Sequence, residues 1–396
     1  MNREGNMKVL ISFGTRPEII KLAPVILTLK REFDVITVHT GQHDILAEEM
    51  INFFKFKIDY RLKDILSITE NKKSLHPVKG EIVEVIRKEK PDVVIVQGDT
   101  RTTFISAFAA FMEKIVLIHL EAGLRTYNKF APFPEEIYRS LISRMADIHL
   151  APTEKAKQNL IKENIREDRI FVVGNSIVDA LILATSKIKE KDVFKELSQY
   201  TNNIKEIKEK EIVLITSHRR ENIGKPLLNI CKSVKKLAEK YNRTVFIWSL
   251  HKNPEVRKIV LNEMKKKRKN IILTGPLSYP TTIYLIKNSS VILTDSGGIQ
   301  EESVSLGKKV IILREVTERP EVVDTGFGYI AGSSVEKITN IFSTIYRKNM
   351  KKGLKKNNPF GDGKTSVKIL KLLKKRRIKE LIYNYPEKWD INLTGS

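Results

Sequence analysis

Short runs of β-branched and apolar residues alternate with helical patterns along almost the whole chain, and this alternation limits the possible folds more than any other feature. The first half contains six such runs, which we predict to be strands: 8–12, 35–39, 93–97, 116–120, 148–151 and 170–173. Helical patterns lie between them at 19–30, 80–88, 102–112 and 154–163. Strands that are apolar along their whole length are typical of a parallel sheet covered by helices on both faces.

The second half repeats the alternation, and 396 residues are too many for one ordinary core. Its predicted strands are 212–216, 245–248, 271–273, 291–294, 310–313 and 328–331, and its predicted helices are 227–241, 255–267, 282–288 and 335–348. We therefore predict an α/β protein with two Rossmann-like doubly wound domains of six strands each, which face a cleft. The domains are 1–184 and 205–364, and the charged segment 187–210 joins them. A basic amphipathic helix from residue 365, in the terminal segment 365–396, is expected to pack back on the first domain through Val367, Leu370, Leu373 and Leu381.

Composition narrows the classes of function. The formal charge of +24 favours anionic partners, but the basic runs at 265–269 and 374–377 lie on helical patterns without the interleaved aromatic residues of a base-stacking surface. We therefore expect no nucleic-acid partner. The single cysteine, Cys231, excludes an internal disulfide, and no apolar run is long enough to span a membrane. With a polar N-terminus, these features predict a cytoplasmic protein without a membrane partner.

The seven histidines do not form a convincing metal site. His39 and His43 are four residues apart, but Gly41 between them interrupts a helix. We therefore predict no metal.

A strand, paired glycines and a helix follow one another within residues 291–306. Glycines let backbone N–H groups approach an anion closely, and the helix N-terminus adds partial positive charge. Glu302 lies four residues after Gly298 on the same helix face, where a carboxylate can accept both hydroxyls of a ribose. The stretch is typical of a nucleotide site, although glycines also occur where a helix merely approaches a strand closely.

Cations follow the first strand of each half. Arg16 and Lys21 lie at the first strand–helix turn, where a guanidinium and an ammonium can clamp a diphosphate, although ordinary surface charge is the alternative. His218, with Arg219 and Arg220, follows strand 212–216 and indicates phosphate binding or acid catalysis. Both positions are expected to face the cleft.

Three carboxylates open turns or helices in the first half. Asp99 and Glu121 each follow a strand, and Glu135 opens a helix on which Arg139 is four residues further and can pair with it. Each carboxylate by itself can be structural, Asp99 for example as an N-cap. Three that face one cleft are a stronger signal, because removal and return of a proton need such groups.

Six motifs occur in a fixed order from about residue 7 to beyond residue 363. They are FGTRPE with Lys21, QGDT at 97–100, HLEAGLRT at 119–126, PFPEE at 132–136 with Arg139, SHRREN at 217–222, and TDSGGIQEE at 294–302 with TERPE at 317–321. Together they resemble the non-hydrolysing UDP-N-acetylglucosamine 2-epimerases. The resemblance implies the GT-B fold, a homodimer, a nucleotide-sugar substrate, and neither a metal nor another cofactor.

The resemblance also implies two sets of site residues, carried over position by position. The UDP-binding set is Arg16, Lys21, His218, Ser296, Gly297, Gly298, Glu302 and Arg319. The catalytic set is Lys21, Asp99, Glu121, Glu135, Arg139 and His218.

The implied reaction inverts carbon 2 of the sugar. UDP leaves by anti elimination as the carbon 2 proton is removed, which forms 2-acetamidoglucal, and UDP adds back after reprotonation from the other face. Cations would stabilise the departing UDP and carboxylates would move the proton, although which carboxylate is the base stays open. The product, UDP-N-acetylmannosamine, would supply N-acetylmannosamine units for surface polysaccharide or glycan synthesis.

One segment departs from the family pattern. Bacterial members bind a second UDP-N-acetylglucosamine as an allosteric activator, partly through a Gln-His pair and an arginine in a short Met-rich segment. Gln42 and His43 are present, but residues 59–68 do not match that segment. Allosteric activation therefore stays open.

Three other functions fit part of the pattern. A hydrolysing relative that releases free N-acetylmannosamine would share the fold and the UDP site. A GT-B glycosyltransferase would need an acceptor pocket, and it has no need of the carboxylates Glu121 and Glu135. A non-catalytic nucleotide-sugar sensor would tolerate the loss of those carboxylates, which are present here.

Overall fold

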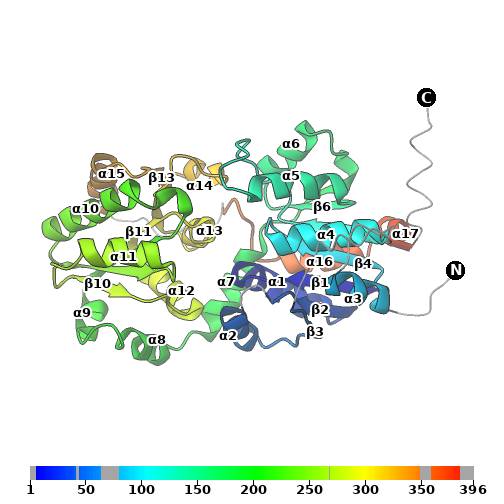
Figure 1. The fold of residues 1–396 in the computed structure, drawn as a ribbon, viewed down its shortest axis with the longest axis horizontal. Helices are drawn as coiled ribbons and strands as arrows, with labels where there is room; N and C mark the ends of the chain where they lie inside the picture. Colours follow the sequence, from blue (N-terminus) through cyan, green and yellow to red (C-terminus); the bar gives the residue numbers. More distant parts are fainter. Residues whose placement is uncertain (1–5, 42–43, 64–79, 267, 348–357, 384–396) are drawn as a thin grey trace. The chain divides into compact units, whose positions relative to one another are not determined.

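The computed structural model describes residues 6–41, 44–63, 80–266, 268–347 and 358–383, and the chain divides into two compact units (Figure 1). The first unit comprises Met1–Ala180 with Phe360–Ser396, and the second comprises Leu181–Pro359. The chain passes from the first unit to the second within helix α7, Ser176–Lys187.

The first unit is built on a parallel sheet of seven strands in the order β3-β2-β1-β4-β5-β6-β7. These strands are β1 Lys8–Phe13, β2 Asp34–His39, β3 Tyr60–Arg61, β4 Val93–Gln97, β5 Val116–Leu120, β6 Ile148–Ala151 and β7 Ile170–Val172. Strand β4, with the sequence VVIVQ, is buried along its whole length, as expected for a strand covered on both faces.

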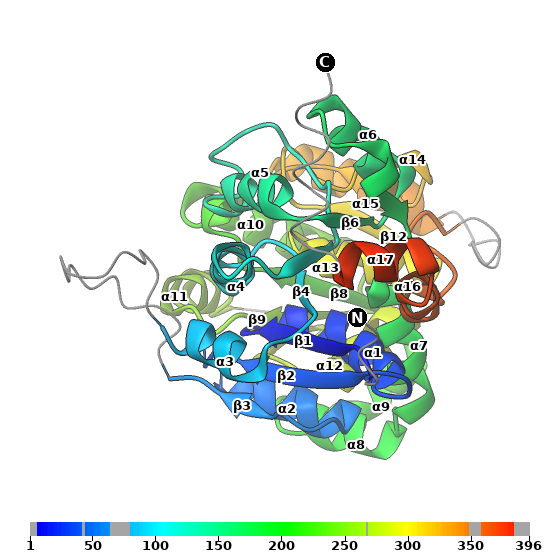
Figure 2. The ribbon, with the colours of Figure 1, turned by 90° about the vertical axis from the view of Figure 1, so that its right-hand side faces the viewer.

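Helices cover both faces of this sheet. They are α1 Arg16–Leu29, α2 Asp44–Phe54, α3 Glu81–Glu89, α4 Arg101–Met112, α5 Glu135–Met145, α6 Glu154–Lys162, α16 Thr365–Leu373 and α17 Arg376–Tyr383, with the 3-10 turn η1 Glu167–Arg169. Figure 2 shows α3, α4 and α5 on one side of the sheet and α1 with α16 on the other. One core of this unit forms between the sheet and α3 to α5, around buried residues such as Leu10, Val94 and Ile105.

The second unit repeats the architecture with a six-stranded parallel sheet in the order β10-β9-β8-β11-β12-β13. Its strands are β8 Glu211–Ser217, β9 Thr244–Leu250, β10 Ile271–Thr274, β11 Ser289–Thr294, β12 Lys309–Ile312 and β13 Gly328–Ile330. Its helices are α8 Glu190–Leu197, α9 Ile204–Glu209, α10 Lys225–Lys240, α11 Pro254–Glu263, α12 Tyr279–Asn288, α13 Gly297–Ser305, α14 Pro320–Asp324 and α15 Val335–Arg347, with the 3-10 turn η2 Arg220–Asn222. The core beneath α10, α11 and α15 is centred on Phe246, Trp248 and Phe342.

Both strand orders are those of a Rossmann-like doubly wound sheet, so the predicted α/β fold class is confirmed. The prediction of six strands in the first half is wrong by one strand. Strand β3 is only two residues long and pairs through Tyr60 and Arg61 with the end of β2, and so short a run has no periodicity to detect.

The segment 187–210, read from the sequence as a join, contains helices α8 and α9 of the second unit. Glu196 on α8 explains the attachment. Its carboxylate accepts hydrogen bonds from the backbone N–H of Ser278 at 2.8 Å and from the hydroxyls of Ser278 and Thr281 at 2.6 and 2.5 Å. A charged helix is thus held at the start of α12 by polar contacts that hydrophobicity does not reveal.

The chain returns to the first unit through α16, which packs against α1. Asp179 on α7 accepts hydrogen bonds from the backbone N–H groups of Thr365 and Ser366 at 3.1 and 2.9 Å, and so satisfies the first turn of α16. The terminal pattern forms two helices rather than one. The predicted apolar side is also partly wrong, because Val367 is 40% exposed, whereas Ile369 is fully buried.

Two buried histidines face each other in register on neighbouring strands, His119 on β5 and His149 on β6. Burial lowers the pKa of His119 to about 4 and that of His149 to about 3. Because both values lie below the ordinary histidine pKa of about 6.5, the unfolded chain binds protons first as the pH falls. Their contribution to stability is therefore complete above about pH 6.5 and is lost as the pH falls toward 4. Asp147, whose pKa burial raises to about 6, offsets part of this loss below pH 6.

We expect urea unfolding to show a lower free energy of unfolding at pH 5 than at pH 7.5, by on the order of 2–4 kcal/mol. His149→Gln, which cannot titrate, should reduce this difference by about half. The control His251→Gln removes an exposed histidine and should leave the difference unchanged. Equal stability of the unsubstituted protein at the two pH values would contradict the prediction.

Within the described ranges, no helix combines the length and the apolarity that crossing a membrane requires.

Candidate active site

The strand order of the first sheet reverses between β1 and β4, the place where doubly wound sheets bind ligands. The turns after these two strands are tied together by the buried carboxylate of Glu18. It accepts hydrogen bonds from the backbone N–H groups of Gly14 and Thr15 at 3.0 and 2.7 Å, and from the hydroxyl of Thr100 at 2.6 Å. Burial raises the pKa of Glu18, and these bonds oppose that rise. Arg16, the first residue of α1, is half-buried beside this linked pair of turns.

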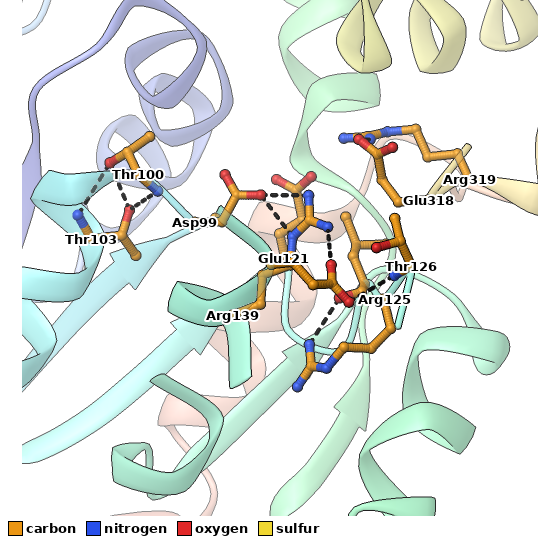
Figure 3. Close-up of polar contacts among 12 residues, drawn as sticks. Asp99, Thr100, Thr103, Glu121, Arg125, Thr126, Arg139, Glu318 and Arg319 are labelled. Atoms are coloured by element: carbon orange, nitrogen blue, oxygen red, sulfur yellow. Dashed lines mark hydrogen bonds and ion pairs between the residues drawn. The ribbon is translucent and has the colours of Figure 1, made fainter. Parts of the chain in front are cut away.

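Asp99 follows β4 and forms an ion pair with Arg139 of α5 (Figure 3). Oδ2 of Asp99 lies 2.7 Å from Nε and 2.5 Å from Nη2 of Arg139, whose side chain is only 5% exposed. Thr100, not Asp99, is the N-cap of α4, so the alternative role of Asp99 as a cap is excluded. Arg139 also pairs with Glu136, three residues before it, at 2.9 Å, and its pairing with Glu135 stays a prediction.

Glu121 follows β5 and pairs with Lys21 of α1. Both carboxylate oxygens lie 2.6 Å from Nζ of Lys21, and the two side chains are 6% and 7% exposed. Gln97 donates a short hydrogen bond to the same carboxylate. Glu121 has a φ of 68°, a left-handed conformation that is costly for a residue other than glycine and often marks functional sites. Lys21, expected as part of a diphosphate clamp, thus contacts a buried carboxylate.

Glu135 is the first residue of α5, and its Oε2 is buried without a hydrogen-bond partner among the residues that the structure describes. A buried acceptor in this state is unusual in a folded protein and calls for an explanation. An oxygen in this state can accept a hydrogen bond or a proton from a bound molecule.

The loop between β5 and α5 is held by residues that belong to neither predicted set. Glu136 accepts hydrogen bonds from the backbone N–H groups of Thr126 and Tyr127, both at 2.8 Å. Arg125 binds both oxygens of Glu163, the C-cap residue of α6, at 2.7 and 2.8 Å. These contacts fix the loop that separates Glu121 from Glu135.

In the second unit the strand order reverses between β8 and β11, and Asp295 ties the turns after these strands together. The fully buried carboxylate of Asp295 accepts hydrogen bonds from the backbone N–H groups of His218 and Arg219 at 2.9 and 3.0 Å, and from the Asn222 amide at 2.9 Å. Hydrogen bonds and the neighbouring His218 lower the pKa of Asp295, although burial alone would raise it. His218 is thereby held at the start of the turn after β8.

Helix α13 begins at Gly297, directly after its N-cap residue Ser296, whose side chain makes no capping hydrogen bond. A Cβ atom at Gly298 would meet no atom within 4 Å, so the backbone there is open to a ligand. A Cβ atom at Gly297 would lie 2.4 Å from Nη1 of Arg319, so only glycine lets this guanidinium rest against the helix start. Open N–H groups beside a cation are typical of a phosphate site.

Arg319 is held from two sides in the second unit. Its Nε lies 2.6 Å from Glu301, and its Nη1 lies 2.5 Å from Glu318, the pair drawn in Figure 3. Glu318 also binds Arg314 at 2.6 Å. Glu302, on α13, is buried. The predicted UDP-binding residues of this unit therefore lie around one sheet edge and one helix start.

Sequence reasoning missed five polar residues that hold the site residues in place. They are Glu18, Gln97, Glu136, Asp295 and Glu318. All five lie inside the six motifs, within two residues of a residue that was assigned a role. Their position inside the motifs is the sequence feature that could have identified them. It does not distinguish a residue that contacts a ligand from one that orients a neighbouring residue.

In the described part of the chain, no three His, Cys, Asp or Glu side chains gather closely enough to hold a metal ion. His43 lies outside the described residues, as do Gln42 and residues 64–68 of the segment that bears on allosteric activation. The absence of a metal and of another cofactor stays a prediction.

The chain has two Rossmann-like units, and each has polar side chains where its strand order reverses. Such an arrangement is suited to bind a nucleotide and to transfer a proton. The family model for UDP-N-acetylglucosamine 2-epimerase matches residues 27–374. The chain belongs to the UDP-N-acetylglucosamine 2-epimerase family, which confirms the resemblance drawn from the six motifs.

Relatives and solved structures match nearly the whole chain. It is 41% identical to the UDP-N-acetylglucosamine 2-epimerase of Neisseria meningitidis over 379 residues, which are 94% of this chain and 100% of the relative. A crystal structure of the Neisseria meningitidis enzyme bound to UDP-GlcNAc is similar, with a TM-score of 0.81 and 40% identity over 93% of this chain and 99% of that chain. The Methanocaldococcus jannaschii enzyme in complex with UDP-GlcNAc and UDP is similar with a TM-score of 0.75 and 36% identity, over 93% of this chain and 99% of that chain.

Proposed function

We propose that the protein interconverts UDP-N-acetylglucosamine and UDP-N-acetylmannosamine by inverting carbon 2 of the sugar. The observation that carries the proposal is two ion pairs in the first unit, the buried pair Lys21–Glu121 and the partly buried pair Asp99–Arg139. Two carboxylates in cationic surroundings at one sheet edge suit a reaction that removes a proton and returns it. Membership of the family, and relatives crystallised with UDP-GlcNAc, support the same substrate.

The mechanism that fits these residues is elimination followed by addition. A carboxylate takes the proton from carbon 2 while the bond between carbon 1 and the UDP oxygen breaks, which leaves 2-acetamidoglucal and UDP. A proton is then delivered to carbon 2 from the other face, and the UDP oxygen bonds again to carbon 1. The candidates for the two proton transfers are Asp99, Glu121 and Glu135, and Oε2 of Glu135 has no hydrogen-bond partner among the described residues.

Departure of UDP places negative charge on the diphosphate, and the second unit has groups suited to receive it. The start of α13 at Gly298 is open, and the Arg319 guanidinium lies beside it. Preorganised donors and cations lower the barrier because they need no rearrangement during the reaction. His218, in the same unit, is assigned to this diphosphate as well.

Proton NMR in deuterated water tests this function. With UDP-N-acetylglucosamine and no added metal, UDP-N-acetylmannosamine carrying deuterium at carbon 2 is expected. Free N-acetylmannosamine with UDP would instead identify the hydrolysing reaction. Unchanged substrate without deuterium would exclude both epimerase reactions and favour a transferase or a sensor.

The protein is also proposed to act as a homodimer and to supply N-acetylmannosamine units for glycan synthesis. The dimer is supported by exposed apolar side chains on neighbouring helices of the first unit, Phe111 on α4 with Ile137 and Leu141 on α5. Sedimentation equilibrium at several concentrations tests the dimer. A species with the mass of a single 45.5 kDa chain at every concentration would contradict it.

Glu302→Ala is expected to weaken UDP binding by a factor of about 10–100, because a buried carboxylate that accepts ribose hydroxyls contributes roughly 1.5–3 kcal/mol. Turnover at saturating substrate should change much less. Isothermal titration calorimetry with UDP measures the affinity, and Glu336→Ala, at an exposed position on α15, is the matched control. Unchanged UDP affinity would remove Glu302 from the binding set.

A further inference from the structure

His218 and Asp295 form a histidine–carboxylate pair at the strand reversal of the second unit. Nδ1 of His218 lies 3.3 Å from Oδ1 of Asp295. The carboxylate also accepts the backbone N–H of His218, at 2.9 Å, so the ring and the backbone of this residue are held by one side chain. The Asp295 side chain is fully buried, whereas 34% of the His218 side chain is exposed. One edge of the ring is therefore fixed, and the rest of the ring is accessible to a ligand.

This geometry selects one tautomer of the neutral ring. An unprotonated Nδ1 would place a lone pair 3.3 Å from the oxygen of an ionised carboxylate, which is repulsive, whereas an N–H group there is attracted to the carboxylate, so the proton belongs on Nδ1. The carboxylate of Asp295 is ionised, because His218 and several donors lower its pKa. Nε2 of His218 then has a lone pair and no proton.

The other groups around His218 come from three further segments. Arg219 and Glu221 lie on or beside η2, and Arg314 follows β12. His251, which follows β9, stacks on His218 with ring centroids 5.2 Å apart. Burial is the largest influence on His218 and lowers its pKa, while Asp295 opposes that effect. The ring is therefore neutral at neutral pH when no anion is bound.

A diphosphate beside such a ring changes its preferred state. A neutral Nε2 without a proton would repel a phosphate oxygen, whereas a protonated Nε2 would donate a charge-assisted hydrogen bond to it. The imidazolium would then have an anion on each side. We propose that Asp295 and a bound diphosphate together hold His218 as an imidazolium, so that UDP binding takes up a proton from solvent; this rests on the proposed function of the same site.

The pairing assigns Asp295 as a positioning residue that acts through His218. It keeps the ring edge with Nε2 toward the ligand and stabilises the positive charge once it forms, in the way that a buried carboxylate orients a catalytic histidine. The proton taken up on UDP binding would then stabilise the negative charge of UDP at the moment when the bond to carbon 1 breaks.

Isothermal titration calorimetry of the full-length protein with UDP at pH 7.5, in buffers with different ionisation enthalpies, measures the proton uptake. We expect between about 0.5 and 1 proton per UDP bound, because the ring changes from neutral to charged. UDP itself is almost fully ionised at this pH, since the second pKa of a phosphate group is about 6. Binding without any dependence on buffer would overturn the inference and leave the epimerase function standing. Absence of UDP binding would contradict the proposed function itself.

Two variants at the stacked histidines identify the group that takes up the proton. His218→Asn should reduce the uptake to near zero, whereas the matched control His251→Asn should retain it. Uptake that survives in His218→Asn, or that disappears in His251→Asn, would overturn the assignment to His218.

Asp295→Asn should reduce the uptake to less than half, because the positive ring then lacks one of its two anions. Undiminished uptake in this variant would remove Asp295 from the proposal. Because Asp295 is fully buried and its loss threatens folding, NMR of the unsubstituted protein with ¹⁵N-labelled histidine gives an independent test. The signals of His218, assigned by comparison with His218→Asn, should show the Nδ1–H tautomer without UDP and the imidazolium with UDP. An Nε2–H tautomer in the free protein would overturn the role of Asp295.

Discussion

Asp99→Asn is expected to lower turnover by a factor of about 10²–10⁴, the usual range for loss of a group that transfers a proton. Asparagine has nearly the same shape and keeps one oxygen that can accept from Arg139, whose guanidinium lies 2.5 and 2.7 Å from the present carboxylate. It cannot take or return a proton. UDP affinity should change by less than about threefold, because Asp99 is not assigned to the diphosphate.

The measurement is the rate of deuterium incorporation at carbon 2, together with UDP affinity by calorimetry. Asp168→Asn is the matched control, since it also removes a carboxylate paired with an arginine, Arg166, but on η1 far along the chain from the motifs. Normal turnover of Asp99→Asn would exclude Asp99 from the catalytic set. A loss of UDP affinity as large as the loss of turnover would indicate a binding role instead.

Lys21→Met should both destabilise the protein and abolish most activity. Lys21 and Glu121 are almost fully buried, so removal of the ammonium takes from a buried carboxylate the cation that contacts both of its oxygens. Breaking one side of such a pair typically destabilises a protein by about 3–5 kcal/mol. Turnover should fall by a factor of at least about 10², because loss of the neighbouring ammonium favours the protonated form of Glu121.

The double variant Lys21→Met with Glu121→Gln separates the two effects. It removes both charges, so most of the lost stability should return, whereas the activity should not. Urea unfolding and deuterium incorporation measure the two quantities. If the double variant is as unstable as Lys21→Met alone, the ion pair is not the cause of the instability. If it regains turnover, Glu121 is not catalytic.

The two units differ in what their buried carboxylates do at the strand reversal. Glu18 in the first unit accepts hydrogen bonds from the turns after β1 and β4, whereas Asp295 in the second unit lies in the turn after β11 and accepts hydrogen bonds from the turn after β8. A carboxylate suits this position because its two oxygens can accept several N–H and O–H donors at once. In the second unit the carboxylate of Asp295 also contacts the ring of His218, so this structural residue also positions a residue of the proposed site.

Much of the fold was predictable because buried strands and helices show a pattern of apolar residues in the local sequence. Strands covered on both faces, such as β4 and β11, must be apolar along their length, and helices that cover them must show an apolar face. Strand β3 and helices α8 and α9 show this pattern weakly. Strand β3 has only two residues, and the two helices bury only Val193, Leu197 and Ile207 among charged residues. Polar contacts of Glu89 with Tyr60 and of Glu196 with α12 help to hold β3 and α8 in place.

The candidate site was predictable in its residues but not in its pairings. Asp99, Glu121 and His218 each follow a buried strand, and in a parallel sheet that position alone brings a side chain to the ligand-binding edge. Helical spacing suggested that Arg139 pairs with Glu135, but it did not indicate Asp99, which the fold brings to Arg139 from 40 residues away. No local rule predicts such a partner, because it depends on how α5 packs against the end of β4.

The amino-acid sequence by itself determined the two doubly wound sheets, the family and the residues at the sheet edges, because each of these depends on local periodicity or on motifs that are contiguous in the chain. The tertiary structure decided which charges neutralise one another. Lys21 meets Glu121 across 100 residues, and His218 meets Asp295 across 77. Those contacts arise only when separate strands align in a sheet, and they determine whether a buried group is charged, neutral or able to exchange a proton.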